Sequence, residues 1–190
     1  ADFPTTLSAY QPTFNGGPAF SPLGLGVSFP NGSDIFVSRL SLNGGNLLTS
    51  TYIGGTGNDG LNTASRLKFN YADEVRGEID IDKNNNIYIA TSTQSSDFPI
   101  TSSFQTTNNG GQEGCIVKMD NQLASIIWSS YLGGSADDGI YSLALDKNDN
   151  IYVTGGTTSA DFPITTNAYQ TAHQDSLRAD AFISLINSEG

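Results

Sequence analysis

The feature that most constrains the fold of this chain is an internal repeat. NNNIYIATSTQSSDFPIT begins at Asn84 and NDNIYVTGGTTSADFPIT begins at Asn148, which gives a unit of about 64 residues. The chain also opens, at Ala1, on ADFPTT, the tail of the same phrase. Repeat units of this kind bury their apolar faces against one another, so the sequence predicts a row of similar units that stack on their neighbours.

Four phrases recur in a fixed order within the unit. They begin at the following residues: DFP at Asp2, Asp97 and Asp161; DIFVSRL at Asp34, EGCIVKM at Glu113 and DAFISLI at Asp180; STYIGGTGNDG at Ser50 and SSYLGGSADDG at Ser129; EIDIDKNNNIYIA at Glu78 and SLALDKNDNIYVT at Ser142. The spacing between phrases is longer in the first copies. This difference indicates two insertions, residues 15–33 and residues 61–72.

The phrases carry the signals of strands and hairpins. Ile79 and Ile81 are separated by one residue, as are Ile87 and Ile89, and this period of two is typical of strands with one buried face. The DKNNN and DKNDN segments are rich in Asn and Asp, which tolerate the backbone of a hairpin turn. No window of about ten or more residues free of Gly and Pro carries a helical stripe. We therefore predict an all-β fold with four strands per unit.

Charge and cysteine content limit the classes of partner. The net charge is −11 and only eight residues are Lys or Arg, whereas nucleic acids and anionic membranes bind clusters of basic residues. No apolar run reaches the roughly 18 to 20 residues that cross a bilayer. We therefore expect no nucleic-acid partner and no membrane insertion. The single cysteine, Cys115, lies in an apolar run, so we interpret it as a small buried hydrophobic residue.

Taken together, the ordered phrases resemble the bacterial β-propeller repeat family SBBP. The segments that carry the resemblance are residues 34–40, 50–59, 79–89, 95–101, 129–138, 143–153 and 159–165. The resemblance implies a propeller module of secreted or cell-surface bacterial proteins, commonly within larger multidomain chains, and it implies no catalytic residues. Cys115 departs from the pattern, because the other copies have Phe36 and Phe182 at this position.

We therefore predict about 2.5 to 3 β-propeller blades, each a four-stranded antiparallel sheet, with a β-sandwich as the alternative. In this reading residues 1–190 are a single partial propeller, divided as follows: residues 1–60 hold the last two strands of a first blade, residues 61–133 a complete second blade, and residues 134–190 the first three strands of a third. Known propellers have about four to eight blades, so nine strands do not close a ring. The expected solutions are a longer propeller, a ring completed by several copies, or an open arc.

The DKN loops are candidate calcium sites. Oxygen-bearing side chains stand at alternate positions, as a hard cation prefers. The six residues are Asp82, Asn84 and Asn86 in the first loop and Asp146, Asn148 and Asn150 in the second. Each loop lacks the distal bidentate Glu of an EF-hand, and an Asx-type hairpin turn without a metal explains the same residues. Apart from this calcium hypothesis, we expect no cofactor.

Several other side chains are candidates for binding or catalysis. Four aromatic residues of the first connector are a candidate ligand-stacking platform: Tyr10, Phe14, Phe20 and Phe29. His173, the only histidine, lies in a polar connector and is expected to be exposed to solvent. Asp137 and Asp138 adjoin a Gly-rich turn, which such carboxylates cap more often than they catalyse. Phe98 and Phe162 of the DFP phrases are expected to pack into sheet edges.

These observations predict a non-enzymatic module, extracellular or on the bacterial cell surface, that acts as a scaffold or a protein-interaction surface. Recognition would lie in loops and in the two insertions, because variable loops on a rigid frame usually carry binding. The expected partners are a protein or a glycan at the cell surface, and further copies of the chain through exposed blade faces. A carbohydrate-binding module and a non-catalytic part of a larger secreted hydrolase are the alternatives.

Overall fold

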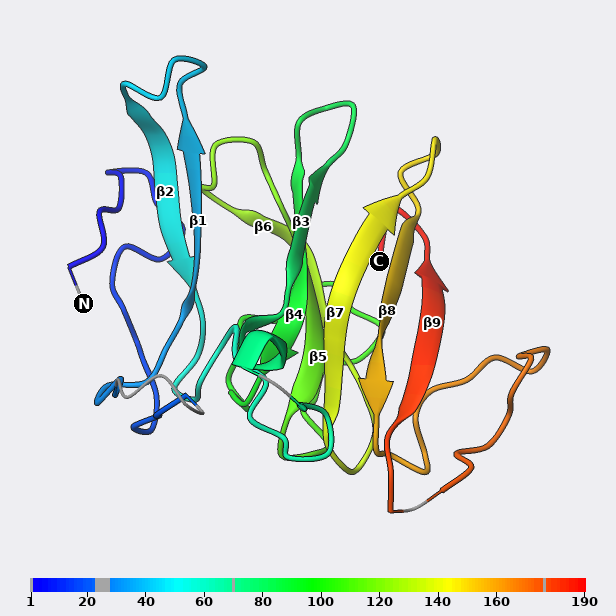
Figure 1. Ribbon diagram of the computed structural model, residues 1–190. Helices are drawn as coiled ribbons and strands as arrows, with labels where there is room; N and C mark the ends of the chain where they lie inside the picture. The colour runs from blue at the N-terminus through cyan, green and yellow to red at the C-terminus, as the bar shows by residue number, and fades with distance from the viewer. Residues whose placement is uncertain (1, 23–27, 70, 176) are drawn as a thin grey trace.

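The computed structural model describes residues 2–22, 28–69, 71–175 and 177–190, and within them the fold is all-β except for one short 3-10 helix (Figure 1). The nine strands and the helix have these bounds: β1 Ile35–Leu40, β2 Leu47–Ile53, η1 Tyr71–Val75, β3 Glu78–Ile81, β4 Ile87–Thr93, β5 Glu113–Met119, β6 Ile126–Leu132, β7 Asp138–Leu145, β8 Ile151–Thr157 and β9 Asp180–Ile186. The predicted all-β class is confirmed. The described residues contain no helix long and apolar enough to span a membrane.

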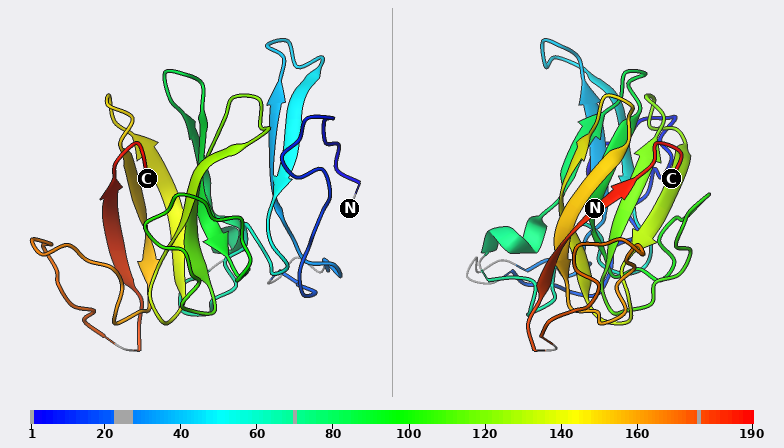
Figure 2. Two further views of the ribbon diagram at one scale, coloured as in Figure 1. Left: turned by 180° about the vertical axis from the view of Figure 1, so that it is seen from behind. Right: turned by 90° about the vertical axis from the view of Figure 1, so that its right-hand side faces the viewer.

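The strands form three antiparallel sheets of two, four and three strands. Sheet 1 has the order β1-β2, sheet 2 the order β3-β4-β5-β6, and sheet 3 the order β7-β8-β9. Figures 1 and 2 show sheet 2 between the other two in both the front and the rear view. The predicted grouping of the nine strands is confirmed, and the described residues do not close into a ring.

The DKN segments close the β3–β4 and β7–β8 hairpins, as predicted. Asn85 and Asp149 both have φ of 63°, the left-handed region that Asn and Asp enter at low cost. The two turns lie at the same end of neighbouring sheets, since Lys83 Nζ is 3.0 Å from Asp149 Oδ2. Equivalent turns therefore occupy equivalent places, which is the behaviour of stacked repeats.

Two apolar cores hold the sheets together, one on each side of sheet 2. The first joins sheets 1 and 2, with Ile53 and Val117 among its members, and the second joins sheets 2 and 3, with Ile116 and Ile151. Cys115 lies wholly buried in the first core, so the interpretation of this residue as a small hydrophobe is confirmed. Burial raises the pKa of its thiol well above the usual value.

The phenylalanine of each DFP phrase packs against the sheet of its own unit. Phe3 contacts Phe36 with ring centroids 4.1 Å apart, and Phe162 contacts Phe182 at 4.4 Å. In the middle unit Cys115 replaces the partner ring, and Phe98 packs instead near Tyr131, at 6.3 Å. Phe98 is nevertheless buried, so the packing role expected for it is confirmed.

Both predicted insertions lie partly outside the described residues, since residues 23–27 of the first and residue 70 of the second are not described. The second insertion runs into η1 and packs against sheet 2 and sheet 3. Asn62 Oδ1 accepts a hydrogen bond of 2.9 Å from Gln112 Nε2, and the Tyr141 hydroxyl donates to Leu67 O at 2.9 Å. These contacts attach the insertion firmly to the frame.

Candidate functional site

The two DKN loops, predicted as calcium sites, are closed by hydrogen bonds to their own aspartates. Asp82 Oδ1 accepts from the backbone N–H groups of Asn84 and Asn86, at 2.8 and 2.9 Å, and Oδ2 accepts from Asn86 Nδ2 at 2.9 Å. Although burial disfavours its charged form, these bonds hold the pKa of Asp82 below its usual value. Both carboxylate oxygens thus already accept hydrogen bonds from their own turn.

The second loop repeats this geometry almost unchanged. Asp146 accepts from Asn148 N at 2.8 Å, Asn150 N at 2.9 Å and Asn150 Nδ2 at 3.0 Å. The Asn150 side chain contributes most to lowering the pKa of Asp146. Over the part of the chain that the structure describes, no group of three or more His, Cys, Asp or Glu side chains gathers as metal ligands. The arrangement is that of an Asx turn, and calcium binding stays a prediction.

The four aromatic candidates of the first connector do not share one surface. Phe14 packs edge-on against Tyr52 of β2, with centroids 5.7 Å apart, while Phe20 stacks on Phe29 at 6.3 Å. Phe14 and Phe29 line a cavity of about 330 Å³ beside sheet 1. Tyr10 does not line it; its backbone N–H donates to Leu123 O at 2.9 Å, in the turn between β5 and β6.

Each Gly-Gly turn is capped by a buried carboxylate. Asp59 Oδ2 accepts from Gly55 N at 2.9 Å and from Ser95 Oγ at 2.8 Å. Asp138 Oδ2 accepts from Gly134 N and from Ser159 Oγ, both at 2.7 Å. Asp138 therefore caps its turn, as expected for a carboxylate in this position.

A second acid lies near each of these caps. Asp34, just before β1, lies near Asp59, and Glu113, the first residue of β5, lies near Asp138. Burial raises the pKa of Asp59 to about 6, and the nearby Asp34 charge adds to the shift. Burial raises the pKa of Glu113 to about 7, and the Asp138 charge pushes it in the same direction. Both Glu113 and Asp138 are fully buried, so the pair can retain a proton but meets no substrate from solvent.

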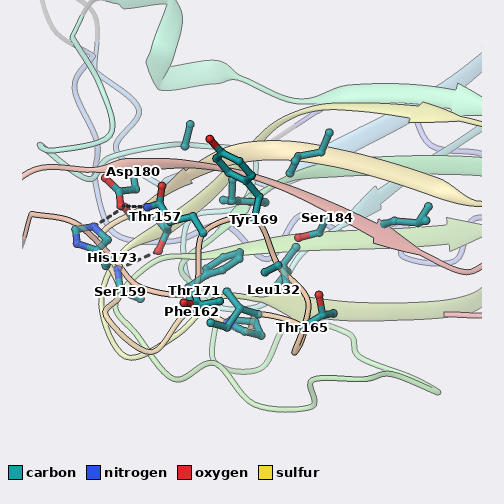
Figure 3. Close-up of a pocket in the computed structure, with 18 of the residues that line it drawn as sticks. Leu132, Thr157, Ser159, Phe162, Thr165, Tyr169, Thr171, His173, Asp180 and Ser184 are labelled. Atoms are coloured by element: carbon teal, nitrogen blue, oxygen red, sulfur yellow. Dashed lines mark hydrogen bonds between the residues drawn. The ribbon is translucent and has the colours of Figure 1, made fainter.

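His173 is half-buried, whereas the sequence suggested a solvent-exposed loop residue. Its Nε2 lies 3.3 Å from the carbonyl oxygen of Thr157, at the end of β8. The imidazole therefore rests against a strand terminus (Figure 3). The hydrogen bond to a backbone carbonyl fits a packing role for this side chain.

A repeated polar clamp on the outermost strand of sheets 1 and 2 was not anticipated from the sequence. In sheet 1, Thr6 N donates to Ser50 O at 3.1 Å, and Tyr52 N donates to Gln11 O at 3.1 Å. The Gln11 side chain also accepts from Gly54 N at 3.0 Å. The loop that follows DFP is therefore hydrogen-bonded along the second half of β2, from Ser50 to Gly54.

Sheet 2 uses the equivalent residues. Ser129 N donates to Thr101 O at 2.9 Å, Tyr131 N to Gln105 O at 3.2 Å, and Gly133 N to Gln105 Oε1 at 3.1 Å. The signal that could have revealed the clamp is an aromatic residue followed by glutamine, shortly after each DFP: Tyr10-Gln11, Phe104-Gln105 and Tyr169-Gln170. Tyr10 is therefore one copy of a repeated position.

The third copy of the clamp, Thr165 with Gln170, lines a cavity of about 900 Å³ beside β9 (Figure 3). Here the loop faces an open space where sheets 1 and 2 have a strand.

Comparison with known proteins agrees with the repeated architecture. No curated protein matches the chain. The family model of the SBBP β-propeller repeat matches residues 127–163, which run from β6 through the β7–β8 hairpin to the last DFP phrase. The chain therefore contains a β-propeller repeat of the SBBP family.

Proposed function

We propose that this chain is a non-enzymatic β-propeller module, extracellular or on the bacterial cell surface, that acts as a scaffold and protein-interaction surface. In this proposal sheets 1, 2 and 3 are successive blades of a partial propeller. The three sheets, the hairpin position that sheets 2 and 3 share, and the SBBP repeat support the blade interpretation. The setting outside the cell comes from the family resemblance.

The observation that carries the proposal is the uncovered apolar surface on the two terminal sheets. Phe36 of β1 is 56% exposed and Ile183 of β9 is 75% exposed, whereas Ile116, which occupies the position of Ile183 in sheet 2, is 0% exposed. Leu40 and Leu185 are also exposed on the terminal sheets. Apolar faces of this kind mark contact with another protein surface, because stacked repeats remain soluble when such faces are covered.

The Phe–Phe pairs indicate what kind of surface covers sheet 1. In sheet 3 the Phe162–Phe182 pair packs against the core shared with sheet 2. The equivalent Phe3–Phe36 pair of sheet 1 lines an open cavity instead. A further sheet in the place that sheet 2 has relative to sheet 3 would cover this pair. A blade-like protein face, from a longer propeller or another copy, is therefore the partner we propose.

Light scattering over a range of protein concentration tests the proposal. We expect the mean mass to rise above that of the monomer, and the double variant Ile183→Lys/Leu185→Lys to remain monomeric at every concentration. Leu42→Lys, at an exposed position in the β1–β2 turn, is the matched control and should associate like the unmodified chain. If the mass of the unmodified chain stays at that of the monomer at all concentrations, the result would count against an interaction role for these faces.

Carbohydrate binding is a second candidate, favoured by the cavity of sheet 1. Phe14, Phe29 and Phe36 line it together with Asp2 and Asn31, and aromatic rings beside hydrogen-bonding groups are the features of a sugar site. A glycan array probed with the chain and with Phe29→Ala would test it. Signals that the variant retains in full would place any sugar elsewhere.

A further inference from the structure

The chain contains four Asn-Gly pairs, and such pairs are places where a protein backbone can modify itself. The pairs begin at Asn15, Asn31, Asn43 and Asn109. In this chemistry the backbone nitrogen of the glycine attacks the side-chain carbonyl carbon of the asparagine. Glycine favours the attack, because it has no Cβ to hinder the approach or to restrict the backbone. The fold around each pair decides whether the attack can occur.

The Asn43-Gly44 pair lies at the tip of the β1–β2 hairpin, outside both apolar cores. Residues 42–48 are all exposed to solvent, and a Cβ built on Gly44 would have no atom within 4 Å. Figure 1 shows this turn at the upper end of sheet 1, away from the other sheets. The turn is closed by two backbone bonds, from Ser41 N to Asn46 O at 2.9 Å and from Gly44 N to Ser41 O at 2.8 Å. The tip can therefore change shape without disturbing the sheets.

The side-chain carbonyl of Asn43 is held and polarised by its own turn. Its Oδ1 accepts hydrogen bonds from Ser41 Oγ at 2.8 Å and from Gly45 N at 3.1 Å. The bond to Gly45 N is that of an Asx turn, which folds the side chain back over the backbone of the next residue, Gly44. Two donors on Oδ1 also stabilise the negative charge that develops there when a nitrogen attacks the carbon, as in an oxyanion hole.

Two of the other pairs are held by the acids near the start of β1 and β5. Gly16 N donates to Asp34 Oδ1 at 2.8 Å, and Gly110 N donates to Glu113 Oε1 at 3.0 Å. Gly110 is also crowded, since a Cβ built on it would lie 1.8 Å from Ala136 O. Ring closure at these pairs must first break bonds that fix the loop to the frame.

The remaining pair, Asn31-Gly32, is restrained by packing. Gly32 is buried, and a Cβ built on it would lie 2.3 Å from Asn58 Oδ1 and 2.5 Å from Gly17 N. The rearrangement that forms a ring at Asn31 would push against these atoms. Of the four pairs, Asn43-Gly44 thus combines open space with an activated carbonyl.

We infer that Asn43 is a site of spontaneous deamidation, which converts it to isoaspartate and aspartate through a cyclic imide. Gly44 N forms a bond to Asn43 Cγ and gives up its proton to water, while the Cγ–Nδ2 bond breaks and the side-chain nitrogen leaves as ammonia. Water then opens the imide at either of its two carbonyls and restores the N–H of Gly44. The net reaction consumes one water and releases one ammonia, with no oxidant or reductant.

The products change the surface of the hairpin tip. Both carry a negative charge in place of a neutral amide, and isoaspartate also lengthens the backbone by one CH₂ group between residues 43 and 44. The segment between Ser41 and Asn46, whose backbones close the turn, must then rearrange. This inference does not depend on the proposed function, because it concerns the chemistry of one turn.

The test is an ageing experiment in mildly alkaline buffer, read by peptide mapping with mass spectrometry that distinguishes isoaspartate from aspartate. In the folded chain we expect Asn43 to convert at least about tenfold faster than each of the other three, the effect of the one or two hydrogen bonds that those pairs must first break. In the chain unfolded by urea the four rates should lie within about twofold of one another, because the folded restraints are absent.

Two variants assign the signal. Asn43→Gln should abolish the isoaspartate that forms in the folded chain, because the longer side chain must close a larger ring. Asn109→Gln, which also replaces an exposed asparagine of an Asn-Gly pair, is the matched control and should age like the unmodified chain. Equal rates at the four pairs of the folded chain, faster conversion at another pair, or isoaspartate that persists in Asn43→Gln would overturn the inference.

Discussion

Sheets 2 and 3 are formed by nearly the same sequence motifs but are buried to different degrees. Every residue of β4 and β5 is buried, whereas β8 and β9 alternate between buried or half-buried and exposed residues over much of their length. Tyr88 is fully buried and its counterpart Tyr152 is partly exposed. The difference teaches that local sequence determines the strands and turns, while neighbouring sheets determine which side chains carry the stability.

The largest expected difference concerns one isoleucine position. Ile116→Ala removes a side chain buried in the second core and should lower the free energy of unfolding by about 2 to 5 kcal/mol. Ile183→Ala removes an exposed side chain and should change it by about 0.5 kcal/mol or less. Urea denaturation of both variants measures the contrast. Equal losses in the two variants would mean that another protein surface covers sheet 3 in solution. The comparison is therefore made on a monomeric sample, in which no second copy covers this sheet.

The next largest difference is expected between the acidic residues that begin β5 and β9, Glu113 and Asp180. Glu113 is buried, its Oε2 has no hydrogen-bond partner among the described residues, and its pKa is raised to about 7. Because the folded state keeps a proton that the unfolded chain loses above about pH 4.5, this group makes stability fall as pH rises from about 4.5 to 7. The cost is complete above that window and absent below it.

Replacing Glu113 with glutamine tests this pH dependence. Glu113→Gln retains an oxygen for the N–H groups of Asn109 and Gly110 and should raise stability by about 1 to 3 kcal/mol at pH 8, with little effect at pH 4. Asp180→Asn at the equivalent, less buried position is the matched variant and should show no such gain. Melting curves at several pH values give the readout, and a gain for Glu113→Gln that does not vary with pH would contradict the assignment.

A smaller difference is expected at the clamp. Gln105→Ala loses the bond to Gly133 N and should destabilise the chain by about 1 kcal/mol. The equivalent Gln170 side chain donates to Asp180 Oδ2, so Gln170→Ala should cost less than half as much. Chemical denaturation of both variants checks this, and a cost for Gln170→Ala equal to that for Gln105→Ala would contradict the prediction.

The smallest effect is expected at the DKN loops, where the two sheets are alike. If the loops are Asx turns alone, Ca²⁺ and EDTA should leave the melting temperature unchanged, because the carboxylate oxygens already accept hydrogen bonds. Asp146→Ala should lower the melting temperature by the same small amount in either condition. A rise in Ca²⁺ that Asp146→Ala abolishes would instead establish the calcium hypothesis.

Much of the fold was readable from the sequence because its signals are local. The alternation of Ile87 and Ile89 predicts a strand, and the Asn and Asp residues around Asn85 predict a left-handed turn. Alternation also suggests one wet face, yet Thr91 and Ser92 of β4 are buried like its apolar residues. Sheet 2 has a neighbouring sheet on each side, and the sequence of a single strand does not indicate this.

The candidate sites were less predictable for a related reason. The DKN segments were predicted correctly as hairpin turns, but the direction of the Asn86 amide, toward Asp82 or away from it, depends on the folded turn. The clamp residues Thr101 and Gln105 act through hydrogen bonds to a strand edge. Such polar contacts produce no periodic pattern, so only comparison of equivalent loops in the three sheets reveals them.

Cys115 lies in the seam where sheets 1 and 2 meet and is the only cysteine of the chain. A thiol reagent reaches its sulfur only when the two sheets separate, so the rate of labelling measures how often the two repeats come apart. The natural sequence thereby supplies a reporter of how independently the units of such an array open, with no engineered probe.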